Sequence, residues 1–197
     1  VVLARNYEEA LALYEKYKDN TLGVISDAQF PVNGKKDPEA GLKLLRAIRA
    51  EDEYVPLIME SSDSENRQRA EAEGFRFVDK NSKKMSIDLR RIMEEHMGFG
   101  DFIFRDPNTH EELVRIHSLK ELQDNIFKIP RDSMLYHISR NHMSRWLTAR
   151  AIFPVSAFLK QVTWHKLQDV DAHRQIIFDA IVQYRHMKNI GVVAVFD

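Results

Sequence analysis

The chain has 197 residues, of which 44% are hydrophobic and 30% charged, so it can form one large domain or two small ones with buried cores. Its formal net charge of −1 gives no electrostatic reason to expect binding to nucleic acid or to an anionic membrane. The absence of cysteine excludes disulfides, thiolate metal sites and cysteine nucleophiles. No apolar run approaches the roughly 20 residues that span a bilayer, and no signal peptide is recognisable. We therefore expect a cytoplasmic protein that binds neither membranes nor nucleic acid.

Residues 1–98 alternate between predicted strands and predicted helices. The apolar runs that predict strands are Val1–Ala4, Leu22–Asp27, Val55–Met59 and Phe75–Val78. Capping residues and apolar spacing predict a helix after each run, with first signals at Asn6, Pro38, Ser62 and Met85 and a buried face of the second helix at Leu42, Leu45 and Ile48. Apolar strands separated by amphipathic helices are typical of an α/β fold with a parallel sheet covered by helices on both faces.

Three polar residues follow the ends of three predicted strands. Asp27 closes one strand, Ser61 follows the next within two residues, and Lys80 follows the last in the same way. Because the carboxyl ends of parallel strands share one edge of a sheet, an acid, a hydroxyl and an amine are expected in one crevice. This set suits phosphoryl transfer, in which Asp27 attacks phosphorus, Lys80 neutralises a phosphoryl oxygen and Ser61 donates a hydrogen bond to the product. Each residue alone is more often a turn former or a solvated charge, and the ordered set favours a site.

The order of these residues resembles the receiver domain of response regulators in two-component signalling. The segments that carry the resemblance, which covers about half of the chain, are Val24–Pro31, Gly41–Leu45, Pro56–Ser62 and Gly74–Lys80. It implies a flavodoxin-like fold, with Asp27 as the phospho-acceptor, Ser61 as the switch hydroxyl and Lys80 as the lysine that receivers carry after the corresponding strand. It also implies that Phe77 is the switch aromatic that rotates inward on phosphorylation, although a plain core aromatic is the alternative interpretation.

The sequence departs from the receiver pattern in three places. Residues Val32–Asp37 are an insertion beside the site, and Asn81 stands where receivers commonly have a proline. Residues Val1–Glu9 resemble a receiver's second strand and helix, so the first strand, the first helix and the acidic pair that holds Mg²⁺ are missing. We expect Mg²⁺ in an intact receiver, but only weak binding here, with Asp27 as its main carboxylate ligand.

The missing strand leaves Val1–Ala4 without its usual neighbour. These residues could move into the vacant central position of the sheet, pair with another molecule, or stay poorly ordered. We expect the first outcome, because an exposed apolar run forgoes the free energy of burial.

The second half of the sequence is mainly helical. Residues 99–117 predict a β-hairpin linker with strands Phe102–Arg105 and Leu113–Ile116, and residues 118–190 predict an antiparallel helical bundle that includes one helix from Met134 to about Arg150. Residues 191–197 have the pattern of a strand that begins a further, truncated domain, so we expect the chain to be a piece of a longer polypeptide.

The histidines and arginines of this half could mark a metal site, a phosphorylatable histidine or a basic surface. His137 and His142 are five residues apart, a spacing that separates them on one continuous helix, and metal ligands prefer spacings of three or four. We therefore interpret the histidines as capping or core-edge residues and the arginines as solvated surface. The residues concerned are His137, His142, His165, His173, His186, Arg140, Arg145 and Arg150.

A second resemblance involves Tyr136–Leu147, Ile177–Lys188 and the Gly191–Phe196 run. These segments are similar to the regulatory region of bacterial proteins related to phosphoenolpyruvate synthase and pyruvate phosphate dikinase. This resemblance implies that receiver-like domains precede catalytic domains that have no counterpart in this sequence.

Together the two resemblances imply a regulatory fragment that is not itself an enzyme, within a parent phosphotransferase. The expected partners are a histidine kinase or phosphotransfer protein and the downstream catalytic domains, and a homodimer stays open. The main alternative is a pseudo-receiver that is never phosphorylated and serves as a docking or dimerisation surface. An autonomous enzyme has little support, because the sequence has no Gly-rich phosphate loop, metal-ligand cluster or nucleophile–base motif.

Overall fold

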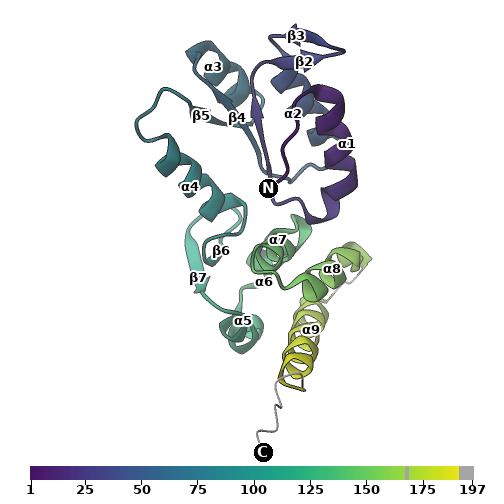
Figure 1. Ribbon diagram of the computed structural model, residues 1–197. Helices are drawn as coiled ribbons and strands as arrows, with labels where there is room; N and C mark the ends of the chain where they lie inside the picture. The colour runs from purple at the N-terminus through teal and green to yellow at the C-terminus, as the bar shows by residue number, and fades with distance from the viewer. Residues whose placement is uncertain (167–168, 191–197) are drawn as a thin grey trace, which may run out of the picture. The chain divides into compact units, whose positions relative to one another are not determined.

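The computed structural model describes residues 1–166 and 169–190 (Figure 1). The chain divides into two compact units, which we call the first unit, Val1–Met97, and the second unit, which begins at Gly98. The strand predicted at Gly191–Phe196 lies outside the described residues.

The first unit is a parallel sheet with helices on both faces. The strands of this sheet are β1 (Val24–Asp27), β4 (Leu57–Ser61) and β5 (Arg76–Asp79), in the order β1-β4-β5. Its other elements are α1 (Tyr7–Tyr17), a 3₁₀ turn at Lys18–Asn20, the hairpin strands β2 (Phe30–Val32) and β3 (Lys35–Asp37), α2 (Ala40–Glu51), α3 (Ser64–Ala72) and α4 (Met85–His96). The expected α/β class with a helix-flanked parallel sheet is confirmed at this level.

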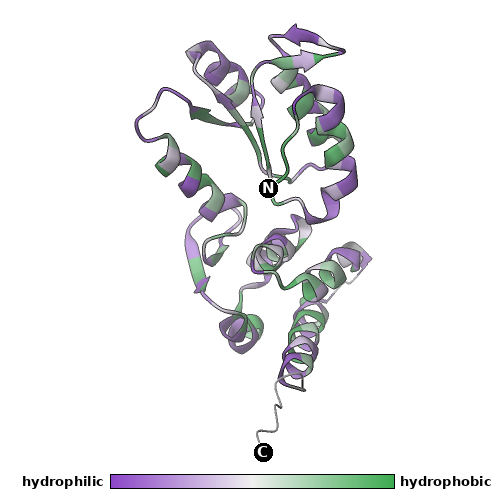
Figure 2. Ribbon diagram, viewed as in Figure 1, coloured by the Kyte–Doolittle hydropathy of each residue, from purple (hydrophilic) through white to green (hydrophobic). Residues whose placement is uncertain are grey.

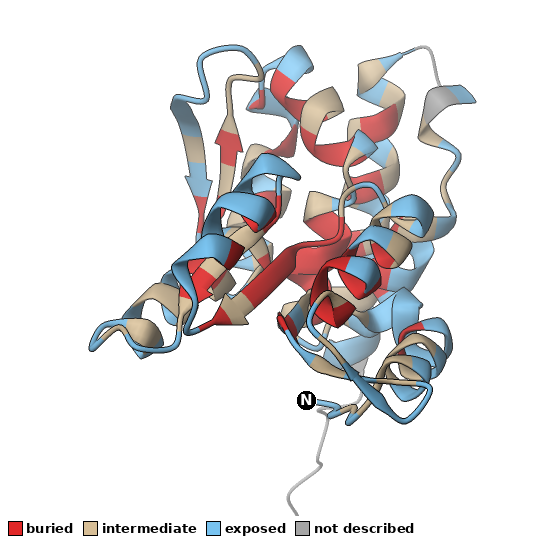
Figure 3. Cartoon of the chain, turned by 90° about the horizontal axis from the view of Figure 1, so that it is seen from above, coloured by how far each residue is buried: buried red, intermediate tan, exposed pale blue. Residues whose placement is uncertain are grey.

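Alternation along β4 divides the core into two layers. Leu57 and Met59 face a cluster that contains residues of α1, α2 and α3, whereas Ile58 faces a cluster with Ile92 of α4. Successive side chains of a strand point to opposite faces, so a fully apolar strand needs helices on both sides. In Figure 3 the buried residues follow the strands and the helix faces turned toward them. The predicted buried face of the second helix is confirmed, because Leu42, Leu45 and Ile48 are all buried.

The segment Val1–Ala4 corrects one expectation, since it forms no strand. Val2 is 58% and Leu3 77% exposed, and β1 pairs directly with β4. Within residues 1–97, all of which are described, no strand pairs with the other edge of β1. Asn6 caps α1 by accepting from the Glu9 N–H, and α1 packs on α2. The packing of α1 on α2 determines where Val1–Ala4 joins the helix. Ordering these four residues as an edge strand would cost backbone entropy, and the few hydrogen bonds gained would not offset that cost.

The inserted residues Val32–Asp37 fold with Phe30 as the antiparallel hairpin β2–β3. Its two-residue turn, Asn33-Gly34, has positive φ angles of 49° and 74°, which is the backbone of a tight hairpin turn. The Asn33 N–H donates to Glu8 Oε1 at 2.9 Å, so the hairpin is attached to α1. At the third helix the cap lies one residue later than predicted, because Asp63 rather than Ser62 accepts the Glu65 N–H.

The second unit combines an antiparallel hairpin with helices around one core. The hairpin strands are β6 (Phe102–Arg105) and β7 (Glu112–Ile116), and their Phe102, Phe104 and Ile116 side chains belong to the same buried cluster as the helices. The helices are α5 (Leu119–Asn125), α6 (Arg131–Ser139), α7 (His142–Ala149), α8 (Phe153–Gln161) and α9 (Val170–Ile190), with 3₁₀ turns at Ile126–Lys128 and Trp164–Lys166. Figure 2 shows these helices as two-sided, with hydrophobic residues along one side. Among the described helices, none has the length and apolar character needed to cross a membrane.

The single helix predicted from Met134 to Arg150 is wrong, because α6 and α7 are separate. Asn141 between them has a φ of 55°, a left-handed conformation that asparagine tolerates better than most residues. The prediction of solvated arginines is also wrong for Arg145, which is buried, and for Arg150. The Arg150 guanidinium donates to the Gly98 and Gly100 carbonyls at 2.7 Å each and lies 4.0 Å from the Trp146 ring centroid.

Candidate functional site

The structure brings Asp27 and Lys80 together at the carboxyl edge of the parallel sheet. Lys80 Nζ donates to Asp27 Oδ1, and it also lies 3.5 Å from Glu60 Oε1. Asp27 and Glu60 are partners in the β1–β4 register, and Lys80 follows β5 directly. Three strand ends therefore place two carboxylates and one amine on the same face of the sheet.

The exposure and charge of this site suit a reaction with a donor molecule that approaches Asp27 from solution. The Asp27 side chain is 50% exposed, against 35% for Lys80 and 23% for Glu60. Burial alone would lower the pKa of Lys80, but the hydrogen bond and charge of Asp27, together with the Glu60 charge, outweigh burial and raise that pKa. Lys80 is therefore an ammonium ion at neutral pH, beside an accessible carboxylate.

Backbone contacts hold the Asp27 loop in place. The Ala28 N–H donates to the Glu60 carbonyl at 3.2 Å, and the Gly41 N–H donates to the Ala28 carbonyl at 3.0 Å. A Cβ atom at position 41 would lie 2.2 Å from the Asp27 carbonyl oxygen, so only glycine permits this approach. The first turn of α2 therefore packs directly on the backbone of the candidate phospho-acceptor.

The Ser61 hydroxyl is turned away from this group. Ser61 is next to Glu60 in β4, so the two side chains point to opposite faces of the sheet. Its Oγ accepts hydrogen bonds from the Asp63 N–H and from Asn66 Nδ2, both at 3.1 Å. Within the fully described residues 1–97, no hydrogen bond joins the Ser61 hydroxyl to the side chain of Asp27 or Lys80. Ser61 therefore organises the start of α3 here, and its predicted contact with a phosphoryl group stays a prediction.

Phe77 lies partly buried on β5, on the face opposite Lys80. Its ring packs against the cluster that contains α1, α2 and α3, and the Arg67 guanidinium carbon lies 4.7 Å from its centroid. Neither the switch role nor the plain core role is decided by this position.

Glu60 is the site residue that the sequence interpretation missed. It lies between the end of the predicted strand Val55–Met59 and Ser61, and its distance from Lys80 makes it part of the charge cluster. The signal available in the sequence was its position on the strand paired with the Asp27 strand. Recognising it requires the register, because a shift of one residue would turn Glu60 to the other face.

The site residues do not fit a magnesium ion well. Asp27 and Glu60 supply two carboxylates, and both already contact Lys80. Within residues 1–166 and 169–190, no group of three or more His, Asp or Glu side chains is arranged to hold a metal. Because Mg²⁺ prefers octahedral oxygen coordination, we derive no step of a reaction through it.

The histidine pair of the second unit differs from the sequence expectation. His137 and His142 were expected to be separated, but their Nδ1 atoms lie 3.0 Å apart because the chain bends at Asn141. His137 Nε2 accepts the Arg105 N–H at 3.0 Å, so neutral His137 carries its proton on Nδ1 and donates it to His142. Burial, and then the nearby Arg105 and Arg140 charges, lower the pKa of His137 to about 4. His137 is therefore a neutral, buried side chain at neutral pH.

Three further histidines singled out by the sequence are His165, His173 and His186. The buried His173 has its two ring nitrogens at 2.7 and 3.1 Å from the Asp169 and Trp164 carbonyl oxygens, and His186 is exposed. The side chain of His165 lies outside the described residues.

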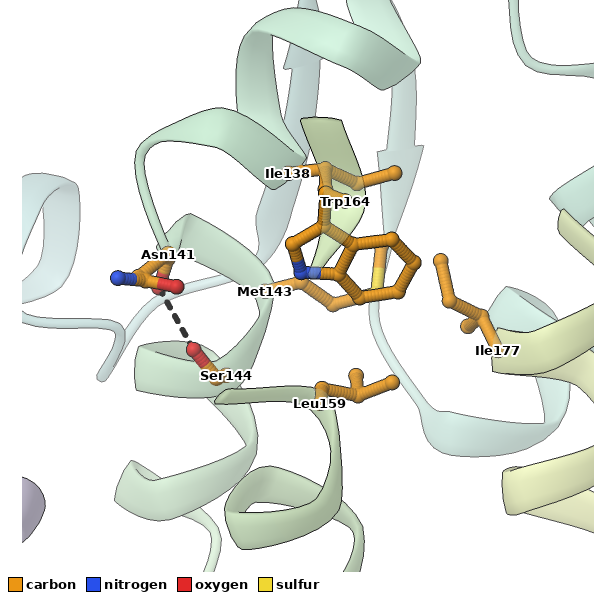
Figure 4. A pocket seen from close by; sticks show the side chains of 7 residues that line it. All are labelled: Ile138, Asn141, Met143, Ser144, Leu159, Trp164 and Ile177. Carbon is orange, nitrogen blue, oxygen red and sulfur yellow. Dashed lines mark hydrogen bonds between the residues drawn. The ribbon is translucent and has the colours of Figure 1, made fainter. Parts of the chain in front are cut away.

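A small cavity also lies in the second unit (Figure 4). Its volume is about 10 Å³, which is room for about one water molecule. Ser144 Oγ donates to the Asn141 carbonyl at 3.1 Å at one side, and apolar side chains such as Ile177 line the other. This space is too small for a substrate.

No protein-family model, curated protein or solved structure matches the chain. Its function is therefore inferred from its residues and their geometry.

Proposed function

We propose that this chain is a regulatory fragment of a phosphoenolpyruvate synthase or pyruvate phosphate dikinase-like protein, and that its first unit is a receiver domain with Asp27 as phospho-acceptor. The observation that supports this most strongly is the contact between the half-exposed Asp27 carboxylate and the Lys80 ammonium at the carboxyl ends of parallel strands. A nucleophilic carboxylate beside a fixed cation is the arrangement that phosphoryl transfer to aspartate requires.

In the proposed reaction an Asp27 carboxylate oxygen attacks the phosphorus of a phosphohistidine on a histidine kinase or phosphotransfer protein. The new P–O bond forms as the bond from phosphorus to the histidine nitrogen breaks, and the electron pair of that bond stays on the nitrogen. Lys80 exchanges its contact with the carboxylate for one with a phosphoryl oxygen, whose charge it neutralises. Glu60, at 3.5 Å, keeps Lys80 in position throughout.

The signal would travel through the loops that follow β1, β4 and β5. The Lys80 N–H donates to the Ser61 carbonyl at 3.0 Å, so movement of Lys80 is coupled to the loop that starts α3. Phe77 lies three residues before Lys80, on β5. A two-state change of these loops would be passed by the second unit to downstream catalytic domains of the parent protein.

A pseudo-receiver, never phosphorylated, is the second candidate, and two observations favour it. The Ser61 hydroxyl is engaged by Asp63 and Asn66 rather than directed at Asp27. Lys80 is shared between Asp27 and Glu60, so its positive charge is already compensated without a phosphoryl group. In this case the first unit would serve as a docking or dimerisation surface.

A phosphoryl mimic separates the two candidates. The longer polypeptide of this proposal, which includes the first strand and the acidic pair that holds Mg²⁺, would be titrated with beryllofluoride and Mg²⁺ while backbone amide NMR shifts are followed, with Asp27→Asn as the test variant. Asp124→Asn, which removes an exposed carboxylate of the second unit, is the matched control. Shifts at Asp27, Ser61 and Lys80 that extend to Phe77, vanish in Asp27→Asn and persist in the control support phosphorylation. An unchanged spectrum of folded protein would leave the pseudo-receiver as the better account.

A further inference from the structure

A cleft separate from the Asp27 group crosses the edge strand of the first unit. It has a volume of about 410 Å³ and lies over β5 between α3 and α4, lined by residues of all three elements. Small-molecule sites in proteins commonly have volumes of about 300–1,000 Å³. Neither Asp27 nor Lys80 lines it, so a ligand here would not occupy the proposed phosphorylation site.

The charge of the cleft is unbalanced at Arg76. The guanidinium of Arg76 is partly buried, and its Nη2 lies 3.1 Å from His96 Nδ1. Within residues 1–97, which are all described, Arg76 makes no ion pair with a carboxylate. Burial lowers the pKa of Arg76, and the negative charge of Glu95, which lines the same cleft, offsets this lowering only in part. A partly desolvated cation without a carboxylate partner is costly, and an anion from solution would offset that cost.

The other arginines of the cleft are already oriented by neighbours. Arg67 lies over the Phe77 ring at 4.7 Å and 3.6 Å from Glu71, whereas Arg91 pairs with Asp88 at 3.2 Å. A guanidinium held on an aromatic face keeps its donors in a fixed plane, which suits bidentate binding of oxyanions. Three arginines and two glutamates, Glu71 and Glu95, line the cleft, and the carboxylate that pairs with Arg91 belongs to Asp88 outside the lining.

We propose that this cleft binds a small organic polyanion, with one carboxylate or phosphate group paired to Arg76 and further oxygens reaching Arg67 and Arg91. The ligand class follows from the chemistry of guanidinium groups, which pair with both kinds of oxyanion. The cleft shares neither Asp27 nor Lys80 with the proposed phosphorylation site, so it would be a second input to the same unit. Phe77, which lines the cleft, connects it along β5 to the region of Lys80.

The test uses the full chain and two probes, citrate for carboxylates and pyrophosphate for phosphates. Each would be titrated at low ionic strength by calorimetry and by amide NMR, with sodium chloride at matched ionic strength as the reference. We expect at least one probe to bind with a Kd below about 1 mM and to shift amides of α3, β5 and the end of α4. The probe that binds more tightly identifies which oxyanion the cleft prefers.

Variants tie binding to the cleft. Arg76→Met and, separately, Arg67→Gln should each weaken binding at least about tenfold, as expected for the loss of a charge-assisted contact. Arg90→Met is the matched control, because Arg90 is also on α4 but is 81% exposed, pairs with Glu94 and does not line the cleft. Circular dichroism would confirm that each variant is folded. Absence of binding by both probes up to about 10 mM, or equal weakening in Arg90→Met, would overturn the proposal. Asp27→Asn should bind normally, so this outcome is distinguishable from failure of the phosphorylation proposal.

Discussion

Replacing Gly41 by alanine tests how the candidate site is built. The added methyl group would lie 2.2 Å from the Asp27 carbonyl oxygen and 2.9 Å from the Ala28 Cα atom. Both are backbone atoms, so no side-chain rotation can relieve the contact. Either α2 must move away from the loop or the Asp27 backbone must shift, and each change breaks the 3.0 Å hydrogen bond from the Gly41 N–H to the Ala28 carbonyl.

The expected size follows from two opposing effects. Overpacking against a fixed backbone costs about 3 kcal/mol, whereas alanine is favoured over glycine in a helix by about 1 kcal/mol. Gly41 lies in α2 and has no positive φ, so conformational strain adds nothing further. We therefore expect Gly41→Ala to lower the free energy of unfolding of the first unit by about 2 kcal/mol.

Urea denaturation followed by far-ultraviolet circular dichroism would measure this loss. Both tryptophans, Trp146 and Trp164, lie in the second unit, so tryptophan fluorescence recorded in parallel reports that unit separately. Gly74→Ala is the matched control, because Gly74 has a φ of 75° but no atom within 4 Å of the added methyl group. It should cost about 1 kcal/mol through strain alone. If Gly41→Ala is neutral or stabilising, helix propensity decides the outcome and the close approach is not a constraint.

Two further predictions concern the second unit. The pKa of His137 is lowered from 6.5 to about 4 in the folded chain, so the unfolded chain binds more protons in that interval. The free energy of unfolding of the second unit should be highest above about pH 6.5 and should fall by about 3 kcal/mol as the pH drops to 4. His137→Gln should remove most of this pH dependence, measured in urea melts that are followed by tryptophan fluorescence. A pH profile unchanged in His137→Gln would contradict the prediction. Arg150→Met should destabilise the second unit by about 2 kcal/mol in the same melts, because it removes two hydrogen bonds to carbonyl groups and the contact with the Trp146 ring. A loss below about 0.5 kcal/mol would show that solvent replaces these contacts.

The regular part of the first unit could be predicted from the sequence because its pattern is local. Apolar runs such as Leu57–Met59 are too short for helices and are bounded by turn residues, and Leu42, Leu45 and Ile48 repeat at helical spacing. The hairpin at Val32–Asp37 was also available, since Asn-Gly is the strongest short signal for a tight hairpin turn. In the comparison with receivers it stands only as an insertion, and its two strands, of three residues each, are too short to give a clear alternating pattern.

The break between α6 and α7 depends on tertiary packing rather than on local sequence. No glycine or proline interrupts Met134–Arg150, and the left-handed conformation of Asn141 lets both helices pack into one buried cluster. The contact between His137 and His142 follows from that bend. Arg150 is similar, because its guanidinium finds carbonyls at Gly98 and Gly100, about fifty residues away in sequence.

At the candidate site the residue types could be predicted from the sequence, but the faces of the sheet to which their side chains point could not. Asp27 and Lys80 meet because both lie at strand ends, which parallel topology alone determines. The directions of Glu60 and Ser61 depend on register, and the structure gives Glu60 the position beside Lys80 and turns Ser61 toward α3. One residue of shift would exchange these two roles.

The open edge of β1 has a consequence for amide hydrogen exchange with solvent. In a parallel ladder the N–H groups of a strand alternate between its two neighbours, and β1 has a partner, β4, on one side. Amides of β1 that point toward β4 are protected by hydrogen bonds, whereas those that point outward are solvated. Exchange rates along Val24–Asp27 should therefore alternate between slow and fast from one residue to the next, while the central strand β4 is protected throughout.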